Sequence, residues 1–436
     1  MRDIVVTLVF LGILPLALRQ TWIGVLLWTW LSVMNPHKMT YGFAYNAPFA
    51  MVAALVTLFS VLISKDKLRL PMDATVILLV IFLFWMCVTT VNALFPEQSA
   101  DSLITVLKIQ LMTLVALMAL RERKHIEAFI WVTVVSVGFY GIKGGVFTIA
   151  SGGSSRVWGP PGTYIEGNNE LGLALTMTIP LMNYLRLVSP NKWIRRALLM
   201  AMLLSAASVL GTQSRGAFLA IAAMAMVLWM RSRSKVTGGV VLVVLSVGLL
   251  AFMPESWEAR MRTIGTYQQD SSAMGRINAW GMAINIANDR ITGGGFAIKN
   301  KTTTERYAPN PDWVHTAHSI YFQALGEQGW PGLIIFLMIG ATALRSTVRI
   351  RKASRDRKES LWLYELGGML QVSMVGYAVG GSFLSLTYLD IAYNVIVIVV
   401  VCQCWLRDER WRTETKGVFG SAEPVGKLSL RAENRA

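Results

Sequence analysis

Residues 75–92 read TVILLVIFLFWMCVTTVN, an apolar run without a charged side chain. A helix of this length crosses a hydrocarbon core of about 30 Å. Further apolar runs occur at 129–150, 238–253 and 333–343. They predict an all-α polytopic membrane protein, because a helix satisfies its own backbone hydrogen bonds where lipid offers no partner.

The composition of the chain supports the membrane assignment. Of its 436 residues, 54% are hydrophobic and 15% are charged, whereas a soluble protein usually carries about 25% charged residues. The net charge of +16 does not indicate nucleic-acid binding, because Lys and Arg cluster between the apolar runs. Such clusters mark the cytoplasmic side of a membrane protein. They lie at 65–69, 121–124, 192–196, 231–235, 345–357 and 407–412.

Placing these clusters inside predicts a multi-pass inner-membrane protein with about twelve transmembrane helices. The expected sections are transmembrane helices in 1–253 with outer loops at 151–169 and 212–216, a large periplasmic loop with short amphipathic helices at 254–317, the last transmembrane helices at 318–406, and a cytoplasmic tail at 407–436.

The first 47 residues allow two arrangements. The apolar runs 4–18 and 23–33 are short for full crossings, and Arg19 and Gln20 separate them. With Pro15 available to kink a helix, we interpret them as one broken crossing. Two full crossings would place the N-terminus outside. The apolar start continues into further apolar segments without a small-residue cleavage site, so we expect no cleavable signal peptide.

Arginines on the expected outer face run against the positive-inside tendency, so each requires an anionic partner. Arg215 stands in the tight outer turn TQSRG at 212–216, between two apolar runs. Because a guanidinium binds phosphate oxygens through a planar fork, Arg215 indicates a phosphate or diphosphate site. A salt bridge to Glu170 or Asp270 is the alternative.

Other outer cations allow a functional and a structural interpretation. Arg156 lies in a loop rich in Gly and Pro, where it either binds an anion or is simply exposed. Arg276 lies one helical turn before Trp280 and is either an anion ligand or structural, and Arg290 is a weaker candidate. Lys143 either reaches the membrane interface or holds an anionic headgroup.

His315 and His318 are three residues apart, which places them on one face of a helix. No nearby Asp, Glu or Cys completes a ligand set, so we expect no metal site and no cofactor. The cysteines Cys87, Cys402 and Cys404 lie in apolar runs without metal-ligand spacing. We interpret His318 as a general base, because histidine titrates near neutral pH; a helix cap is the alternative.

Three stretches together resemble the O-antigen ligase and polymerase superfamily over about 141–332. In that family a histidine after the large periplasmic loop begins a helix with Glu-x-Gly-x-x-Gly, which resembles HSIYFQALGEQGWPGL at 318–333. The turn at 212–216 resembles a second family motif. Arg276 and Trp280, followed by the glycines at 293–295, resemble a third. Ser319 departs from the Asn that ligases often have at this position.

One branch of the superfamily is described as O-glycosylation ligases associated with the exosortase system. The chain resembles this branch in three stretches, GIKGG at 141–145, RVWGPP at 156–161 and NNE at 168–170. The resemblance to this branch allows two acceptors, lipid A–core and a protein. The side chains predicted to bind substrate are Asn168, Asn169, Glu170, His315 and Arg290.

The resemblance implies a GT-C-like glycosyltransferase that passes a glycan from undecaprenyl diphosphate to a lipid A–core hydroxyl at the periplasmic face. It would act without metal and with inversion. His318 would take the hydroxyl proton, and the expected diphosphate ligands are Arg215, Arg156, Arg276 and Lys143. Alternatives are an O-antigen polymerase, a protein O-glycosylation ligase and a transporter of lipid-linked sugars. The transporter is disfavoured because paired repeats are not evident.

Overall fold

A computed structural model describes residues 1–64, 68–231 and 271–414, together with scattered residues between 235 and 257. The expected crossing at 238–253 lies largely outside the described residues, as do Asp270, parts of two basic clusters and the tail beyond 414. Throughout the described part of the chain the regular elements are helices, which confirms the all-α prediction.

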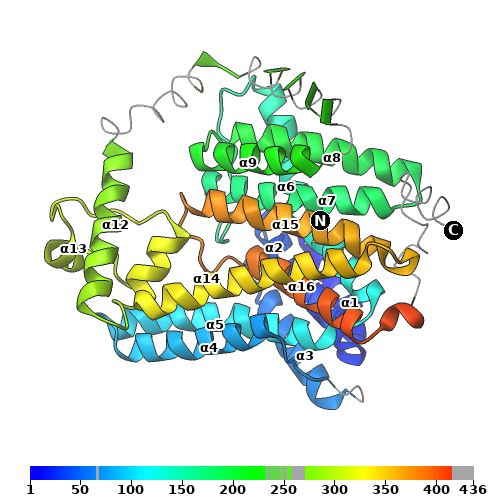
Figure 1. Cartoon of the computed structure of the whole chain (residues 1–436), viewed down its shortest axis with the longest axis horizontal. Helices are drawn as coiled ribbons and strands as arrows, with labels where there is room; N and C mark the ends of the chain where they lie inside the picture. Colours follow the sequence, from blue (N-terminus) through cyan, green and yellow to red (C-terminus); the bar gives the residue numbers. More distant parts are fainter. Residues whose placement is uncertain are drawn as a thin grey trace.

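The helices carry the labels of Figure 1. The α-helices are α1 (Arg2–Arg19), α2 (Thr21–Val33), α3 (Phe49–Ile63), α4 (Ala74–Val91), α5 (Pro96–Ala119), α6 (Arg123–Ala150), α7 (Asn168–Val188), α8 (Lys192–Gly211), α9 (Arg215–Arg231), α12 (Ser271–Asp289), α13 (Lys301–Tyr307), α14 (Ile320–Ser354), α15 (Leu361–Gly381) and α16 (Asp390–Arg407). Short 3-10 helices are η1 (Pro36–Met39), η2 (Phe43–Asn46), η4 (Lys358–Ser360) and η5 (Arg410–Arg412).

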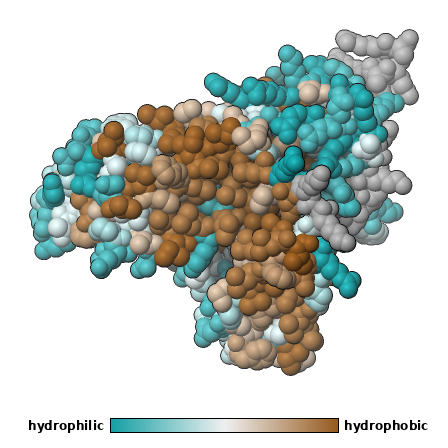
Figure 2. All heavy atoms as spheres, turned by 90° about the horizontal axis from the view of Figure 1, so that it is seen from below, coloured by the Kyte–Doolittle hydropathy of each residue, from teal (hydrophilic) through white to brown (hydrophobic). Residues whose placement is uncertain are grey.

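Seven of the described helices are long and apolar enough to cross a membrane, namely α4, α5, α6, α7, α8, α14 and α16. Figure 1 shows the long helices running side by side, with α12 lying across them near one end. In Figure 2, a broad hydrophobic surface lies between two hydrophilic regions. These features fit a membrane protein, and the count of about twelve crossings stays a prediction.

Helix α7 lies at the centre of the bundle and packs against α6, α8, α9 and α15. Its residues from Leu171 to Met182 are all buried and are apolar or small on every face, which is typical of a helix surrounded by protein. The buried hydroxyls of Thr176 and Thr178 donate to the carbonyls of Gly172 and Ala174, at 2.8 and 2.7 Å. These bonds satisfy polar groups that would otherwise be costly to bury.

Described residues of three basic clusters, those at 65–69, 121–124 and 407–412, lie at one end of the bundle. Arg69, Arg121 and Arg407 line one cavity, and the backbone N–H of Arg123 donates to the Glu414 carboxylate at 3.2 Å. The opposite end joins the expected outer segments. There the N–H of Leu94 donates to the Gly294 carbonyl at 3.0 Å. Each end of the bundle therefore contains segments that the charge pattern assigns to the same side of the membrane.

The N-terminal segment corrects the interpretation as one broken crossing. Gln20 is extended, separates α1 from α2, and lets the two helices pack against each other. The carboxylate of Asp3, at the start of α1, accepts the N–H groups of Gly42 and Ala44 at 3.0 and 3.1 Å. These residues follow α2, so α1 and α2 are antiparallel. Pro15 lies inside α1 without ending it.

The N-terminus lies at the end of the expected outer loops, because Met1 lines the same groove as Trp158. This position agrees with the alternative of two crossings. The chain reverses at Gln20, after an Arg19 side chain that is exposed. Apolar length alone does not reveal such a reversal.

Helices α6 and α8 approach closely along glycines of α6. A side chain at Gly141 or Gly144 would overlap Ser205 or Ser208 of α8, and one at Gly145 would overlap the Leu204 backbone. Small residues allow backbones to come this close, which favours helix association in membranes. The GIKGG motif is therefore part of a helix–helix contact.

We expect Gly145→Ala to lower the free energy of unfolding by about 1–3 kcal/mol, because the added methyl group overpacks this contact. The measurement is thermal unfolding of the purified protein in detergent. Gly340→Ala is the control, since no atom lies within 4 Å of a Cβ at that helical position. Equal melting temperatures for the two variants would contradict the close contact.

Candidate functional site

Arg276 connects two other predicted residues. It lies half-buried near the start of α12. It interacts electrostatically with Glu170 at the start of α7 and with His318 just before α14. These residues, from three distant parts of the sequence, therefore lie near enough for their charges to interact, and we call them the central cluster.

Two side chains of α12 hold the segment that carries His318. The amide of Asn278 donates to the carbonyls of Asn310 and Trp313, at 2.9 and 3.1 Å. The indole of Trp280 donates to the Ala317 carbonyl at 2.6 Å and stacks on Phe322, with ring centroids 4.8 Å apart. Arg276 and His318 are thus positioned by the same helix.

His318 has an unusual backbone conformation. Its φ is 43°, in the left-handed region that few residues other than glycine adopt. Ser319, rather than His318, occupies the N-cap of α14. Within the described part of the chain, the buried Nδ1 atom of His318 has no hydrogen-bond partner. A strained residue with an unengaged ring nitrogen is typical of a functional site.

The surroundings of His318 keep its imidazole neutral. Burial lowers its pKa from 6.5 to about 4, assisted by the positive charges of Arg276 and Lys299 and by His315. At pH 7 the ring is therefore in the form that accepts a proton. Sequence alone suggests that His318 titrates near neutral pH, because an unperturbed histidine has a pKa of about 6.5. In the unliganded site the lowered pKa removes that titration.

Arg215 is the first residue of α9 and is half-buried. The Ser214 hydroxyl oxygen accepts the N–H of Ala217 at 3.1 Å, which caps the helix. Gln213 before it has a φ of 53°, also in the left-handed region. The turn thus places a cation at the positive end of a helix dipole, where an anion is favoured.

The loop at 382–389 connects the starts of α9 and α14. Phe383 packs against Gly216. Thr387 donates from its N–H and its hydroxyl to the Gln323 side-chain oxygen, at 3.2 and 2.9 Å. The Tyr388 hydroxyl donates to the Glu327 carboxylate at 2.8 Å. One loop therefore fixes the Arg215 turn relative to the helix that follows His318.

The loop before α7 is tied to the same turn. The guanidinium of Arg156 donates to the Gln213 side-chain oxygen at 3.3 Å, and the Gln213 amide donates to the Gly153 carbonyl at 3.1 Å. The Asn168 amide donates to the Thr212 carbonyl at 2.8 Å. Asn168 is buried and holds the turn, whereas Arg156 is exposed.

The remaining predicted residues lie in different places. Asn169 is half-buried at the second position of α7, and His315 is exposed beside Gly275 of α12. Arg290 donates to the carbonyls of Gly293, at 3.1 Å, and Asn92. Its guanidinium thus holds a backbone turn. Lys143 is exposed on α6 and lines a groove with Arg156.

Helix α14 is interrupted at Gly329, whose φ of 68° is left-handed. Three donors satisfy carbonyls around the interruption. The N–H groups of Gly294 and Gly295 donate to Gly326 and Glu327, at 2.8 and 3.0 Å. The Trp85 indole donates to Gln328 at 2.8 Å. The glycines at 293–295 are therefore a backbone contact to the Glu-x-Gly-x-x-Gly helix.

Two residues of the site were not predicted. Lys299 acts on His318 through its charge, and its position in the expected outer segment was the available signal. Tyr388 binds Glu327 from a loop 61 residues away. No motif in the sequence connects Tyr388 with Glu327.

The fold and the site together define a helical membrane protein with a cluster of cations and a neutral histidine at one end. Residues 200–337 match the family described as O-Antigen ligase, and this match includes Arg215, Arg276 and His318. It supports a place in the O-antigen ligase superfamily. Residues 1–189 match a family of unknown function, DUF5935. No curated protein matches the chain.

We expect Lys299→Gln to raise the pKa of His318 above about 4, because the variant removes a positive charge that opposes protonation. NMR titration of the histidine ring protons measures this change, and the spectrum of His318→Gln assigns the signal. Lys301→Gln is the matched control, since Lys301 pairs with Glu305 at 3.6 Å. An unchanged pKa in Lys299→Gln would contradict the electrostatic interpretation.

Proposed function

We propose that the protein transfers a glycan from undecaprenyl diphosphate to a hydroxyl of lipid A–core, at the periplasmic face of a bacterial inner membrane. The observation that carries this proposal is the cluster of Arg276 and His318 within the O-antigen ligase match. Arg215, in the same match, lies on a turn that the 382–389 loop links to α14.

Arg215 and Arg276 bind the diphosphate of the donor. Negative charge develops on this leaving group as the glycosidic bond breaks, and fixed guanidinium groups stabilise it more in the transition state than in the ground state. The N-terminus of α9 adds a favourable dipole. Arg156 reaches the same turn through Gln213, so it can assist a phosphate at its edge.

His318 is the general base. As the acceptor oxygen attacks the anomeric carbon, the hydroxyl proton passes to the neutral imidazole, and the bond from that carbon to the diphosphate oxygen breaks. A single displacement inverts the anomeric centre. The negative diphosphate beside Arg276 offsets the charge that disfavours protonation of His318. Donor binding therefore prepares the base for its proton.

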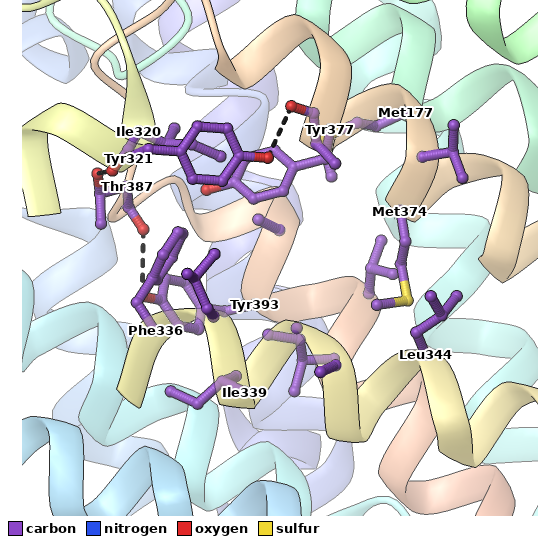
Figure 3. A pocket seen from close by; sticks show the side chains of 18 residues that line it. Met177, Ile320, Tyr321, Phe336, Ile339, Leu344, Met374, Tyr377, Thr387 and Tyr393 are labelled. Carbon is purple, nitrogen blue, oxygen red and sulfur yellow. Dashed lines mark hydrogen bonds between the residues drawn. The ribbon is translucent and has the colours of Figure 1, made fainter. Parts of the chain in front are cut away.

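A lipid site adjoins the proposed base. A cavity of about 260 Å³ lies between α14, α15 and α16. Its lining includes Ile320 and Tyr321, which follow His318 and Ser319 in the sequence. Figure 3 shows Met374 and Leu344 toward its other end. The Tyr321 hydroxyl donates to the Ala378 carbonyl at 2.9 Å, so the cavity offers mainly carbon surface. This surface suits part of the polyprenyl chain.

The distribution of charge supports the orientation. Described residues of the basic clusters, among them Arg69, Arg121 and Arg407, lie at the end opposite His318, and positive segments stay in the cytoplasm. In this orientation the residues after α16 are cytoplasmic and the proposed active site is periplasmic. No nucleotide sugar is required, because the donor already carries a leaving group, and Arg215 and Arg276 would supply the positive charge that a metal ion provides in other enzymes.

The test combines purified protein, undecaprenyl-diphosphate glycan and lipid A–core in EDTA, and follows a product ladder on a gel. We expect His318→Ala to lower the transfer rate about 10²- to 10⁴-fold, the usual contribution of general-base catalysis. Arg215→Ala should lower it as well, because the leaving-group charge loses a ligand. Lys301→Ala should retain activity, and circular dichroism checks that each variant folds. Full activity of His318→Ala would remove His318 from the mechanism.

The same assay separates the alternatives. Elongation of the lipid-linked glycan without transfer to lipid A–core would indicate a polymerase. Transfer to an exported protein substrate would indicate a protein O-glycosylation ligase. Movement of the lipid-linked glycan across vesicles, without a new glycosidic bond, would indicate a transporter.

A further inference from the structure

A second site is formed by the N-terminal helices. A groove of about 920 Å³ lies between α1, α2, α6 and the loop at 156–161. Its lining includes four cationic side chains, those of Arg2, Lys38, Lys143 and Arg156. Its lining does not include Arg215, Arg276 or His318. The groove is therefore separate from the proposed catalytic cluster.

The four cations are available to a ligand. Among the residues that the structure describes, no carboxylate lies within salt-bridge distance of any of them. The nearest acid in sequence, Asp3, is occupied by the N–H groups of Gly42 and Ala44. The groove thus holds four cations that make no ion pair with a described carboxylate.

The cations are held on a partly aromatic wall. The Lys38 ammonium lies 4.3 Å from the Tyr45 ring centroid, and the Arg2 guanidinium lies 5.7 Å from that of Tyr41. Arg2 also donates to the Met39 carbonyl at 3.4 Å. Cation–π contacts orient these groups without cancelling their charge.

The rest of the wall is apolar and exposed. Val5 of α1, Phe139 and Phe147 of α6, and Trp158 of the loop line the groove and present large hydrophobic surfaces. Helix α6 is a candidate membrane span, so these apolar groups offer a surface that suits a lipid chain. A ligand that satisfies both surfaces has an anionic head and an apolar body.

The loop at 156–161 connects the groove to the turn that carries Arg215. Arg156 lines the groove and donates to Gln213 at 3.3 Å, two residues before Arg215. The backbone N–H of the next residue, Val157, donates to the Gly211 carbonyl at 3.0 Å. The loop at 156–161 therefore forms a wall shared by the groove and the Arg215 turn.

We infer that this groove binds the acceptor as an amphiphile whose head group carries phosphate. The inference rests on the proposed function, which requires an acceptor site distinct from that of the donor diphosphate. Four cations favour a multiply charged phosphate head over a single carboxylate, and the guanidinium of Arg156 binds phosphate through its fork. In this assignment Lys143 serves the acceptor, and Arg156 stands between the acceptor groove and the turn that carries Arg215.

Binding is measured by native mass spectrometry in detergent, with lipid A, the same lipid after phosphatase treatment, and inorganic phosphate as probes. For the double variant Lys38→Gln/Lys143→Gln we expect the Kd for lipid A to rise at least about tenfold, since charge-assisted bonds are lost. The control Lys192→Gln/Arg196→Gln removes two exposed charges at the opposite end and should bind normally.

Three binding results would overturn the inference. The first is equal affinity for lipid A of the unaltered protein and of the Lys38→Gln/Lys143→Gln double variant, which we call the groove variant. The second is undiminished binding of the dephosphorylated lipid. The third is binding of free phosphate as tightly as lipid A, which would indicate an anion site without a lipid component.

Turnover gives an independent test. In the groove variant, the KM for the lipid acceptor should rise about tenfold, while the KM for the lipid-linked donor stays unchanged. An increase in the donor KM instead would assign the groove to the donor and overturn the inference. If the unaltered protein transfers no glycan, the proposed function fails, whereas the lipid A measurements still decide the chemistry of the groove.

Discussion

The interruption of α14 at Gly329 is the constraint on which the site depends. A broken helix inside an apolar bundle frees carbonyl groups that cannot reach water, and each unsatisfied group costs several kcal/mol in lipid. Donors from Trp85 and from the glycines at 293–295 supply the missing bonds. These bonds join α4, the segment after α12 and α14. The helix that begins beside His318 thus has a fixed place.

The site is positioned mainly by bonds to backbone atoms. Asn278 and Trp280 hold carbonyls of the segment before His318, and Asn168 holds the turn before Arg215. Such bonds fix where the chain runs, while the guanidinium and imidazole groups carry the chemistry. The surrounding packing also sustains left-handed backbone at His318, which would otherwise be unfavourable.

The sequence predicted the helical class, because apolar length is a local signal. It also singled out Arg276 and His318, whose functional roles stay predictions. It did not predict the N-terminal hairpin, since two short apolar runs fit a kinked helix as well as two antiparallel ones. The pKa of His318 depends on burial and on Arg276 and Lys299, which only the folded chain brings near. The Tyr388 contact to Glu327 likewise joins segments without a shared pattern.

The glycine contact between α6 and α8 has a consequence for how the two matched regions can vary. Helix α6 lies in the region matched at 1–189, and α8 lies mostly in the region matched at 200–337. Gly145 of the first region meets Leu204 of the second. Recombination between relatives that exchanged one region would therefore preserve the fold only where the incoming helix kept matching small residues.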